Sequence, residues 1–320
     1  MNAPVCRLLL ALACVIAIPA LAQKYPSKPV RMIVGIAPGG GLDAGARQVA
    51  SKLSEVLGEQ VFVENRPGAG TTIASAAVAA AAPDGYTLQY AETSLLIAPS
   101  LYKNLTFDPV KSFIAVGGVG WEPLIVVVNP AVPAATTAEL IALLKANPGK
   151  YGYGSPGIGT AHHLAMEMFR TQAGVNIIHV PYKGAALYLP DLMSGVLPLA
   201  IASVAASLPL AKAGKVRPIA LSRPTRIALA PELPTLAETL PGFDAAPSFF
   251  ILAPAGTSAE VVTRLAEALR TAVTSDEVKR GFQSRGATAE FVAPAALAAS
   301  IEADVRKWGV LVRESGAKLE

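Results

Sequence analysis

Two glycine-rich turns hold the residues with the greatest chemical potential in this sequence. One covers 38–43 (Pro-Gly-Gly-Gly-Leu-Asp) and the other 154–160 (Gly-Ser-Pro-Gly-Ile-Gly-Thr). Apolar residues with helical spacing follow each turn, which predicts a helix beginning there. The first N–H groups of a helix have no partner within it, and together with the positive end of the helix dipole they bind anions. Two such turns, in different thirds of the chain, favour capture of a small anion from two sides.

Glycine-rich turns also occur in nucleotide-binding motifs, but the two main motifs fail here. No Gly-Lys pair is followed by Ser or Thr, so the phosphate-binding P-loop is absent. Residues 152–157 match G-x-G-x-x-G, yet the preceding 147–150 (Asn-Pro-Gly-Lys) do not predict a buried strand. The next predicted strand, 177–180, ends without an acidic residue. A dinucleotide site needs both contexts, so no nucleotide cofactor is expected.

Candidate catalytic and metal-binding residues have simpler interpretations. Ser155 lacks the glycine two positions earlier that a nucleophile elbow needs, because Tyr153 stands there. His163 and Glu167 share one face of a predicted helix and could begin a metal site, but no third ligand is evident. A histidine with a carboxylate partner is the favoured interpretation. We therefore expect no catalytic residue, no metal and no cofactor.

Two basic residues near the turns could contact an anion, and an acidic one has a structural interpretation. Arg47 and Lys183 have the required charge, although a solvated side chain or a structural pair is the simpler interpretation of either one alone. Asp43 is favoured as the cap of the helix that follows the first turn.

The first 22 residues predict an export signal. Arg7 precedes the apolar run 8–18, and residues 19–22 (Pro-Ala-Leu-Ala) provide the small residues that signal peptidases accept. The run is shorter than the roughly 20 apolar residues that span a bilayer. We expect cleavage near Ala22 and an exported protein without cysteines, because Cys6 and Cys14 both lie in the signal.

Length and charge describe a globular protein that does not bind nucleic acid. Loss of 22 of the 320 residues leaves 298, enough for two domains of ordinary size. The net charge of +4 falls to +3 with Arg7, the basic residues are scattered, and aromatic residues are few.

Short β-branched runs alternate with helical patterns, which predicts strand–helix units in an α/β fold. A polar segment, 92–94 (Glu-Thr-Ser), ends one predicted strand, where open α/β sheets bind ligands. Thr136 and Glu139 form a capping pattern before one of the predicted helices. The expected strands are 30–36, 61–63, 86–90, 124–128, 177–180, 197–200, 216–221 and 249–252; helices are expected after Asp43, up to 82, after Thr136, and over 161–173, 187–193 and 259–273, with more helix toward the C-terminus.

Seven motif-like stretches occur along essentially the whole chain after the signal. They are 25–29 (YPSKP), 38–43 (PGGGLD) with Arg47, 64–70 (ENRPGAG), 83–88 (PDGYTL), 153–164 (YGSPGIGTAHHL), 180–184 (VPYKG) and 231–235 (PELPT). In sequence and in order, they resemble the Bug/TctC family, the substrate-binding proteins of tripartite tricarboxylate transporters.

The resemblance implies a two-lobed, flytrap-like periplasmic binding protein of the type II topology. Each lobe of such a protein is a mixed sheet flanked by helices. We expect one lobe to combine 24–123 with 248–320, and the other to contain 124–247. The protein is expected to be a monomer that closes on a small carboxylate ligand.

In this family, loop N–H groups, small hydroxyls and ordered waters hold the ligand carboxylate between the lobes. Transferred to this sequence, the predicted contacts from the first lobe are Gly39, Gly40, Gly41, Asp43, Thr93 and Ser94; those from the second are Ser155, Gly159, Thr160 and Ser203. Ser203 stands where relatives often have a polar or acidic residue, so a ligand with an extra amino or hydroxyl group is expected to be handled differently.

Two alternatives to transport remain open. The loaded protein could signal to a sensor kinase instead of delivering its ligand to membrane permease subunits. An exported hydrolase is less favoured, because it needs a nucleophile with an oriented base and the three histidines match no such motif.

Overall fold

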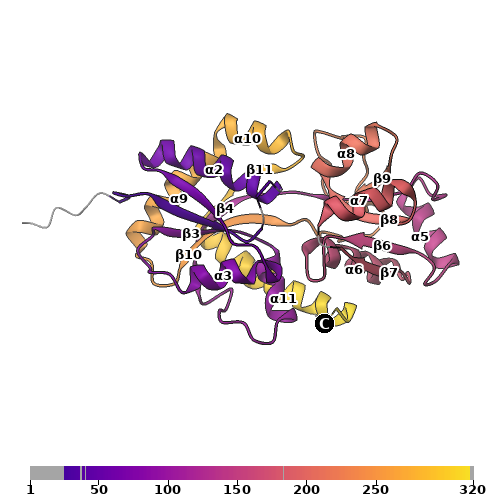
Figure 1. Ribbon diagram of the computed structural model, residues 1–320, viewed down its shortest axis with the longest axis horizontal. Helices are drawn as coiled ribbons and strands as arrows, with labels where there is room; N and C mark the ends of the chain where they lie inside the picture. Colours follow the sequence, from indigo (N-terminus) through magenta and orange to yellow (C-terminus); the bar gives the residue numbers. More distant parts are fainter. Residues whose placement is uncertain (1–24, 37, 40, 183, 318–320) are drawn as a thin grey trace, which may run out of the picture.

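The computed structural model describes residues 25–317 except 37, 40 and 183. Two mixed β-sheets, each covered by helices, form a two-lobed α/β fold (Figure 1). The elements are β1 (Val30–Val34), α2 (Gly41–Leu57), β2 (Val61–Asn65), η1 (Ala69–Thr71), α3 (Thr72–Ala79), β3 (Thr87–Glu92), α4 (Ser94–Leu101), β4 (Phe113–Trp121), β5 (Leu124–Val128), α5 (Thr137–Ala146), β6 (Gly152–Ser155), α6 (Ala161–Ala173), β7 (Ile178–Pro181), α7 (Ala185–Ser194), β8 (Leu199–Ser203), α8 (Val204–Lys212), β9 (Arg217–Leu221), η2 (Leu236–Glu238), β10 (Ser248–Pro254), α9 (Ala259–Thr274), α10 (Asp276–Gln283), β11 (Thr288–Val292) and α11 (Pro294–Ser315).

The first lobe is built on a six-stranded sheet of order β11-β4-β10-β3-β1-β2. Strands β1, β2 and β3 are parallel, whereas β10 runs antiparallel to both of its neighbours, β3 and β4. The sheet therefore combines an early and a late part of the chain. Strand β4 leaves it toward the second lobe and β10 returns from there, as the two crossing segments in Figure 1 show.

The second lobe is built on a five-stranded sheet of order β7-β6-β8-β5-β9. Strand β6 is parallel to β7 and β8, and β5 is antiparallel to β8 and β9. All five strands come from one continuous stretch of the chain. The lobe boundaries that the sequence predicts, at residues 123 and 247, remain a proposal.

Apolar side chains of β1 are buried on both faces of the first sheet, and helices cover each face. Val30, Met32 and Val34 pack with α2, α9 and α10, while Ile33 points to the opposite face, covered by α3, α4 and α11. Strand β5 is buried along its whole length, in keeping with its unbroken apolar run. Helix α11 packs on α4 and β4 and reaches α6 of the second lobe.

Most predicted elements are present with shifted ends, but three expectations about local structure were wrong. Helix α2 begins at Gly41, so Asp43 lies inside the helix and is not its cap. Strand β6 occupies 152–155, where no strand was expected. Gly154 must be small there, since a Cβ on it would lie 2.4 Å from Cδ2 of Leu197. A glycine required by close packing adds nothing to the hydrophobic pattern from which a strand is predicted.

The third wrong expectation concerns the C-terminal part, where β11 interrupts the predicted helix. Its partner β4 was not predicted, because glycines weaken the strand signal. These glycines admit β11: a Cβ on Gly120 would lie 2.1 Å from the carbonyl oxygen of Thr288, and one on Gly118 would lie 2.7 Å from Cβ of Val292.

Leu53 tests the packing of α2 on the first sheet. Its side chain is 1% exposed, so Leu53→Ala is expected to lower the free energy of unfolding by about 2–5 kcal/mol, as is usual for a buried leucine. Leu187, which is 55% exposed, is the matched control, and Leu187→Ala should change stability by less than about 0.5 kcal/mol. Urea unfolding of the chain from residue 23 onward measures both; equal losses would contradict the packing described.

Candidate functional site

The loop before α2 is held by its own carboxylate. Asp43 is 3% exposed. Its side chain accepts hydrogen bonds from Gly39 N (2.9 Å) and Asn65 Nδ2 (2.8 Å) and pairs with Nε of Arg47 at 3.0 Å. Burial alone would raise the pKa of Asp43, but the hydrogen bonds outweigh it and hold this pKa below its usual value. Asp43 thus orients the loop from inside the lobe. Gly40 lies outside the described residues.

The end of β3 is tied to the start of β10. Oγ1 of Thr93 accepts the N–H of Ser248 at 2.9 Å and lies 3.3 Å from Oγ of Ser248. Thr93 is 1% exposed and Ser94, the first residue of α4, is 5% exposed. The Ser94 hydrogen bonds to the carboxyl of Glu92 lower the pKa of that carboxyl, but burial outweighs them and raises it. Both predicted residues therefore have partners within the first lobe.

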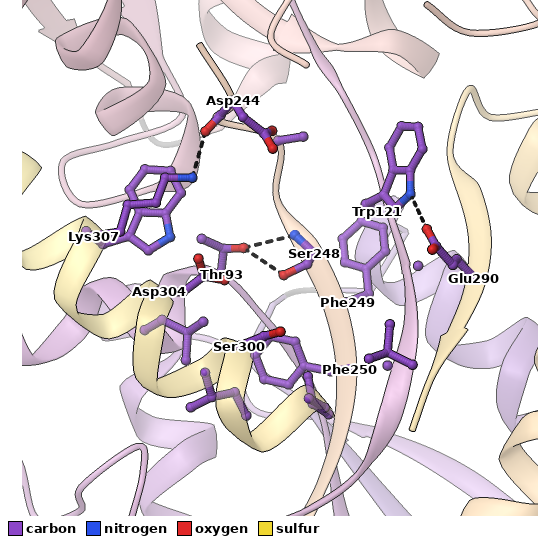
Figure 2. Close-up of a pocket in the computed structure, with 18 of the residues that line it drawn as sticks. Thr93, Trp121, Asp244, Ser248, Phe249, Phe250, Glu290, Ser300, Asp304 and Lys307 are labelled. Atoms are coloured by element: carbon purple, nitrogen blue, oxygen red, sulfur yellow. Dashed lines mark hydrogen bonds between the residues drawn. The ribbon is translucent and has the colours of Figure 1, made fainter. Parts of the chain in front are cut away.

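A cavity of about 350 Å³ lies beside Thr93, between α11 and the two segments that connect the lobes (Figure 2). Nε1 of Trp121 donates to Glu290 at 2.9 Å, and Nζ of Lys307 donates to the carbonyl oxygen of Asp244 at 2.7 Å. The guanidinium of Arg223 lies 3.9 Å from the centre of the Trp121 ring. The two hydrogen bonds join the connecting segments to β11 and α11, so this cavity belongs to the hinge.

Two histidines hold the loop between β6 and α6. Oγ of Ser155 lies 2.7 Å from Nε2 of His179, and Nδ1 of His163 accepts the N–H of Gly159 at 3.2 Å. The two imidazole rings stack with their centres 4.0 Å apart. Burial lowers the pKa of His163 to about 4 and that of His179 to about 3, so both rings are neutral at pH 7. Ser155 is 0% exposed and its hydroxyl is used inside the lobe.

The start of α6 offers unused donors. Thr160 is the N-cap residue: its Oγ1 accepts the N–H of His163 at 3.2 Å and donates to the carbonyl oxygen of Gly157 at 2.8 Å. The N–H groups of Ala161 and His162, in the first turn, have no acceptor in the part of the chain that the structure describes. This is the anion-binding arrangement that the second glycine-rich turn predicts.

Gly159 brings this loop against the first lobe. A Cβ on Gly159 would lie 2.5 Å from Cδ1 of Leu101, which ends α4. Ser203 lies elsewhere at the lobe junction: it is the N-cap of α8, and its Oγ accepts the N–H of Ala206 at 3.3 Å. Among the described residues, no hydrogen bond joins the 38–43 loop to the 155–160 loop.

Two sequence signals have structural explanations. Glu167 accepts a hydrogen bond from the hydroxyl of Tyr153 at 2.6 Å and pairs with Arg170 at 2.8 Å, rather than joining His163 in a metal site. No cluster of three potential metal ligands occurs among the residues described. The contact between Ser155 and His179 resembles a nucleophile and base, but the serine is buried and the imidazole stacks on Tyr153 as well as on His163.

Most of the chain matches a known protein family. The sequence model of the TctC family, described as "Tripartite tricarboxylate transporter family receptor", matches residues 45–317. The chain belongs to the TctC family. Protein BugT of Bordetella pertussis is 35% identical over 308 residues, which cover 95% of this chain and 94% of BugT. Proteins of this family are periplasmic binding receptors. No helix within the described ranges is both long and apolar enough to span a membrane.

Solved structures agree with the architecture of the receptor. Rpa4515 of R. palustris with adipate is 32% identical, with a TM-score of 0.83 over 92% of this chain and 100% of its own. MatC of Rhodopseudomonas palustris, with bound malate, is 26% identical, with a TM-score of 0.78 over 90% of this chain and 100% of its own. Both ligands in those structures are dicarboxylates.

Sequence reasoning missed several charged residues near the junction, notably Glu122, Arg285 and Glu290. Burial raises the pKa of Glu122 to about 7. No motif marks these residues, and a single charged residue after an apolar run is usually a solvated side chain. Among the acidic residues at the junction, Glu92 was the one that the sequence could have indicated, because it is next to the predicted Thr93 and Ser94.

The buried histidines predict acid sensitivity. Because the folded pKa of His163 lies below that of an unfolded histidine, the unfolded chain takes up a proton first as pH falls from about 6.5 toward 4. Protonation of His163 in the unfolded chain should therefore lower the free energy of unfolding by on the order of 1–2 kcal/mol by pH 5. Above pH 7 this loss is absent, because the histidine is neutral in both states. His163→Phe, which retains a stacking ring, should show a shallower loss when urea unfolding is compared at pH 7, 6 and 5. Identical pH slopes for the two proteins would rule out this role.

Proposed function

We propose that the receptor binds a small carboxylate between its two lobes and delivers it to the membrane subunits of a tripartite transporter. The family supports this role, and adipate and malate in the structures of two relatives support the ligand class. We also propose that residues 1–22 are removed near Ala22 on export to the periplasm. No catalytic residue or cofactor is part of this proposal.

The start of α6 is the observation on which the proposal rests. Two N–H groups, on Ala161 and His162, have no acceptor among the described residues and lie at the positive end of a 13-residue helix. This helix begins beside Gly159, which lies against Leu101 of the first lobe. Backbone N–H groups at a helix start carry partial positive charge and converge on one point. They can therefore bind a carboxylate without a lysine or arginine side chain. In this proposal, Ser155 and Thr160 position the loop through their hydrogen bonds, and Gly159 lets it approach α4.

The first lobe supplies the opposing surface. Gly39 and Gly41 begin the loop and the helix, and Asp43 keeps the loop in place through Arg47 and Asn65. Thr93 and Ser94 hold the end of β3 at the hinge, and Ser203 caps α8. Closure of the lobes would exclude water from the ligand and strengthen each contact with it.

A carboxylate panel tests the proposal. We expect at least one member of a set of mono-, di- and tricarboxylates to raise the melting temperature of the chain from residue 23 onward. A ligand at one hundred times its dissociation constant adds about 2.7 kcal/mol of stability. Isothermal titration calorimetry then gives the affinity and stoichiometry. If no carboxylate in a broad panel shifts the melting temperature or releases heat, the receptor does not bind this class.

Gly159 tests whether binding needs close approach of the lobes. Gly159→Ala places a methyl group against Leu101, so ligand affinity should fall about tenfold through overpacking at the junction. Gly174→Ala is the matched control, because Gly174 also has a positive φ, of 60°, but a Cβ there meets nothing within 4 Å. Both variants should lose about 1–3 kcal/mol of stability from backbone strain. Equal affinities in calorimetry would contradict a role for closure at Gly159.

A further inference from the structure

The turn between β2 and α3 holds two residues in an unfavourable backbone conformation. Among the described residues, Ala69 and Thr71 are the only ones other than glycine with a positive φ, of 45° and 74°. Their neighbours Gly68 and Gly70 adopt positive φ at little cost, whereas an alanine resists it and a β-branched threonine resists it more. Such strain persists only where the surrounding structure holds it, and it is concentrated at functional sites. Neither Ala69 nor Thr71 is part of the proposed site.

Thr71 lies against the chain that leads into the first glycine-rich loop. Strand β1 ends at Val34. A Cβ on the next residue, Gly35, would lie 2.5 Å from Cβ and 2.9 Å from Cγ2 of Thr71. Oγ of Ser75 donates to the carbonyl oxygen of Thr71 at 3.2 Å and accepts a hydrogen bond from Nε2 of Gln89 at 2.8 Å, which ties the turn to β3. The side chain of Thr71 therefore fills the space beside Gly35.

Residues just before the turn hold the same chain at further points. The N–H of Arg66 donates to the carbonyl oxygen of Val34 at 2.8 Å. Nδ2 of Asn65 donates to the carbonyl oxygen of Ile36 at 3.0 Å and to Oδ1 of Asp43 at 2.8 Å. Together with the contact of Thr71, these bonds support the first glycine-rich loop from one side.

The other side of the turn lies against the end of α4. A Cβ on Gly70 would lie 2.9 Å from the hydroxyl oxygen of Tyr102, the residue that follows α4. The preceding residue, Leu101, is the one against which Gly159 lies. The turn thus contacts the chain that leads into the first loop and also the helix end that the second loop contacts.

No hydrogen bond of its side chain offsets the strain at Thr71. The residue is 8% exposed, and its Oγ1 has no hydrogen-bond partner in the part of the chain that the structure describes. A glycine at this position would adopt a φ of 74° freely and would bury no unpartnered hydroxyl. What the threonine adds is its contact with Gly35, which a glycine could not make.

We propose that Thr71 is a positioning residue of the carboxylate site. Its side chain fixes the chain at Gly35 and so sets the course of the 38–43 loop relative to the start of α6. Thr71 itself touches no ligand. This inference rests on the proposed function and adds a residue that acts on the same site through the loop.

Replacement of Thr71 by glycine tests the inference. Thr71→Gly removes the strain and the contact with Gly35 together. The melting temperature of the chain from residue 23 onward should change by less than about 3 °C, because relief of strain offsets the lost packing. Affinity for adipate, malate or the tightest-binding member of the carboxylate panel should nevertheless fall about tenfold or more in calorimetry. A merely structural residue would change the melting temperature and leave the affinity unchanged.

Ala69→Gly is the matched control. It relieves strain two positions away, where the side chain is exposed. This variant should melt at the same or a higher temperature and should bind the same carboxylate within about twofold of the wild type. An equal loss of affinity in both variants would attribute the effect to a more flexible turn and would overturn the role of the Thr71 side chain.

A double variant tests the contact itself. Gly35→Ala alone places a methyl group against Cβ of Thr71 and should weaken binding at least as much as Thr71→Gly does. In the double variant the nearest atom of residue 71 is its Cα, 3.0 Å away. The double variant should therefore bind at least about threefold more tightly than Gly35→Ala alone. If Gly35→Ala does not fold, recovery of folding in the double variant is the expected result; no recovery of either kind overturns the contact.

The outcomes separate this inference from the proposed function. If the wild type binds a carboxylate and Thr71→Gly binds it within about twofold, the inference fails and the carboxylate receptor stands. If the wild type binds no carboxylate of the panel, the proposed function fails and this inference fails with it.

Discussion

The pairing of β10 with both β3 and β4 is the constraint on which the rest of the structure depends. Strand β10 returns from the second lobe and is inserted, antiparallel, between two strands formed before the chain left the first lobe. The first sheet therefore cannot be completed until the chain has passed through the second lobe and returned as β10. Thr93 and Ser248 join the two strand ends at this point, and Trp121 and Glu290 join β4 to β11. The 38–43 loop and the end of β3 are therefore placed relative to a hinge that includes strands of the same sheet.

The two glycine-rich turns begin from similar sequence features but are held by different kinds of group. Before α2, the loop depends on a buried ionised carboxylate, Asp43, and faces Glu122. Before α6, it depends on two stacked neutral histidines. Both arrangements satisfy loop N–H groups internally, and both restrict loop motion through side chains from other elements. They differ in the titratable groups that surround each loop, a carboxylate beside the first and two imidazoles beside the second.

Agreement between sequence and structure was greatest where a local pattern is sufficient. Helix α6 has the predicted bounds, 161–173, because Thr160 caps it and Gly174 ends it in the left-handed conformation. Strand β5 matches 124–128 because an unbroken apolar run between polar residues specifies a strand buried on both faces. The pattern was insufficient for β4, β6 and β11, where glycines permit close approach of a neighbour that the local sequence does not reveal. The predicted site had the same limit: its loops were recognised, but not the internal hydrogen bonds of Thr93 and Ser155. Asp43 was expected to have an internal role, but as a helix cap and not as the group that holds Gly39.

The sequence by itself determined the family, the two-lobed α/β class and the two helix starts, since these depend on short motifs and on the order of strands and helices. Only the tertiary structure decided which polar groups remain for a ligand. Ser155 and Asp43 have hydrogen-bond partners from other strands, while the hydroxyl of Tyr90, which no motif marks, has no hydrogen-bond partner among the described residues. The physical reason is that a hydrogen bond or an electrostatic interaction needs two groups. The second group can come from anywhere along the chain, so only the folded structure shows which group it is.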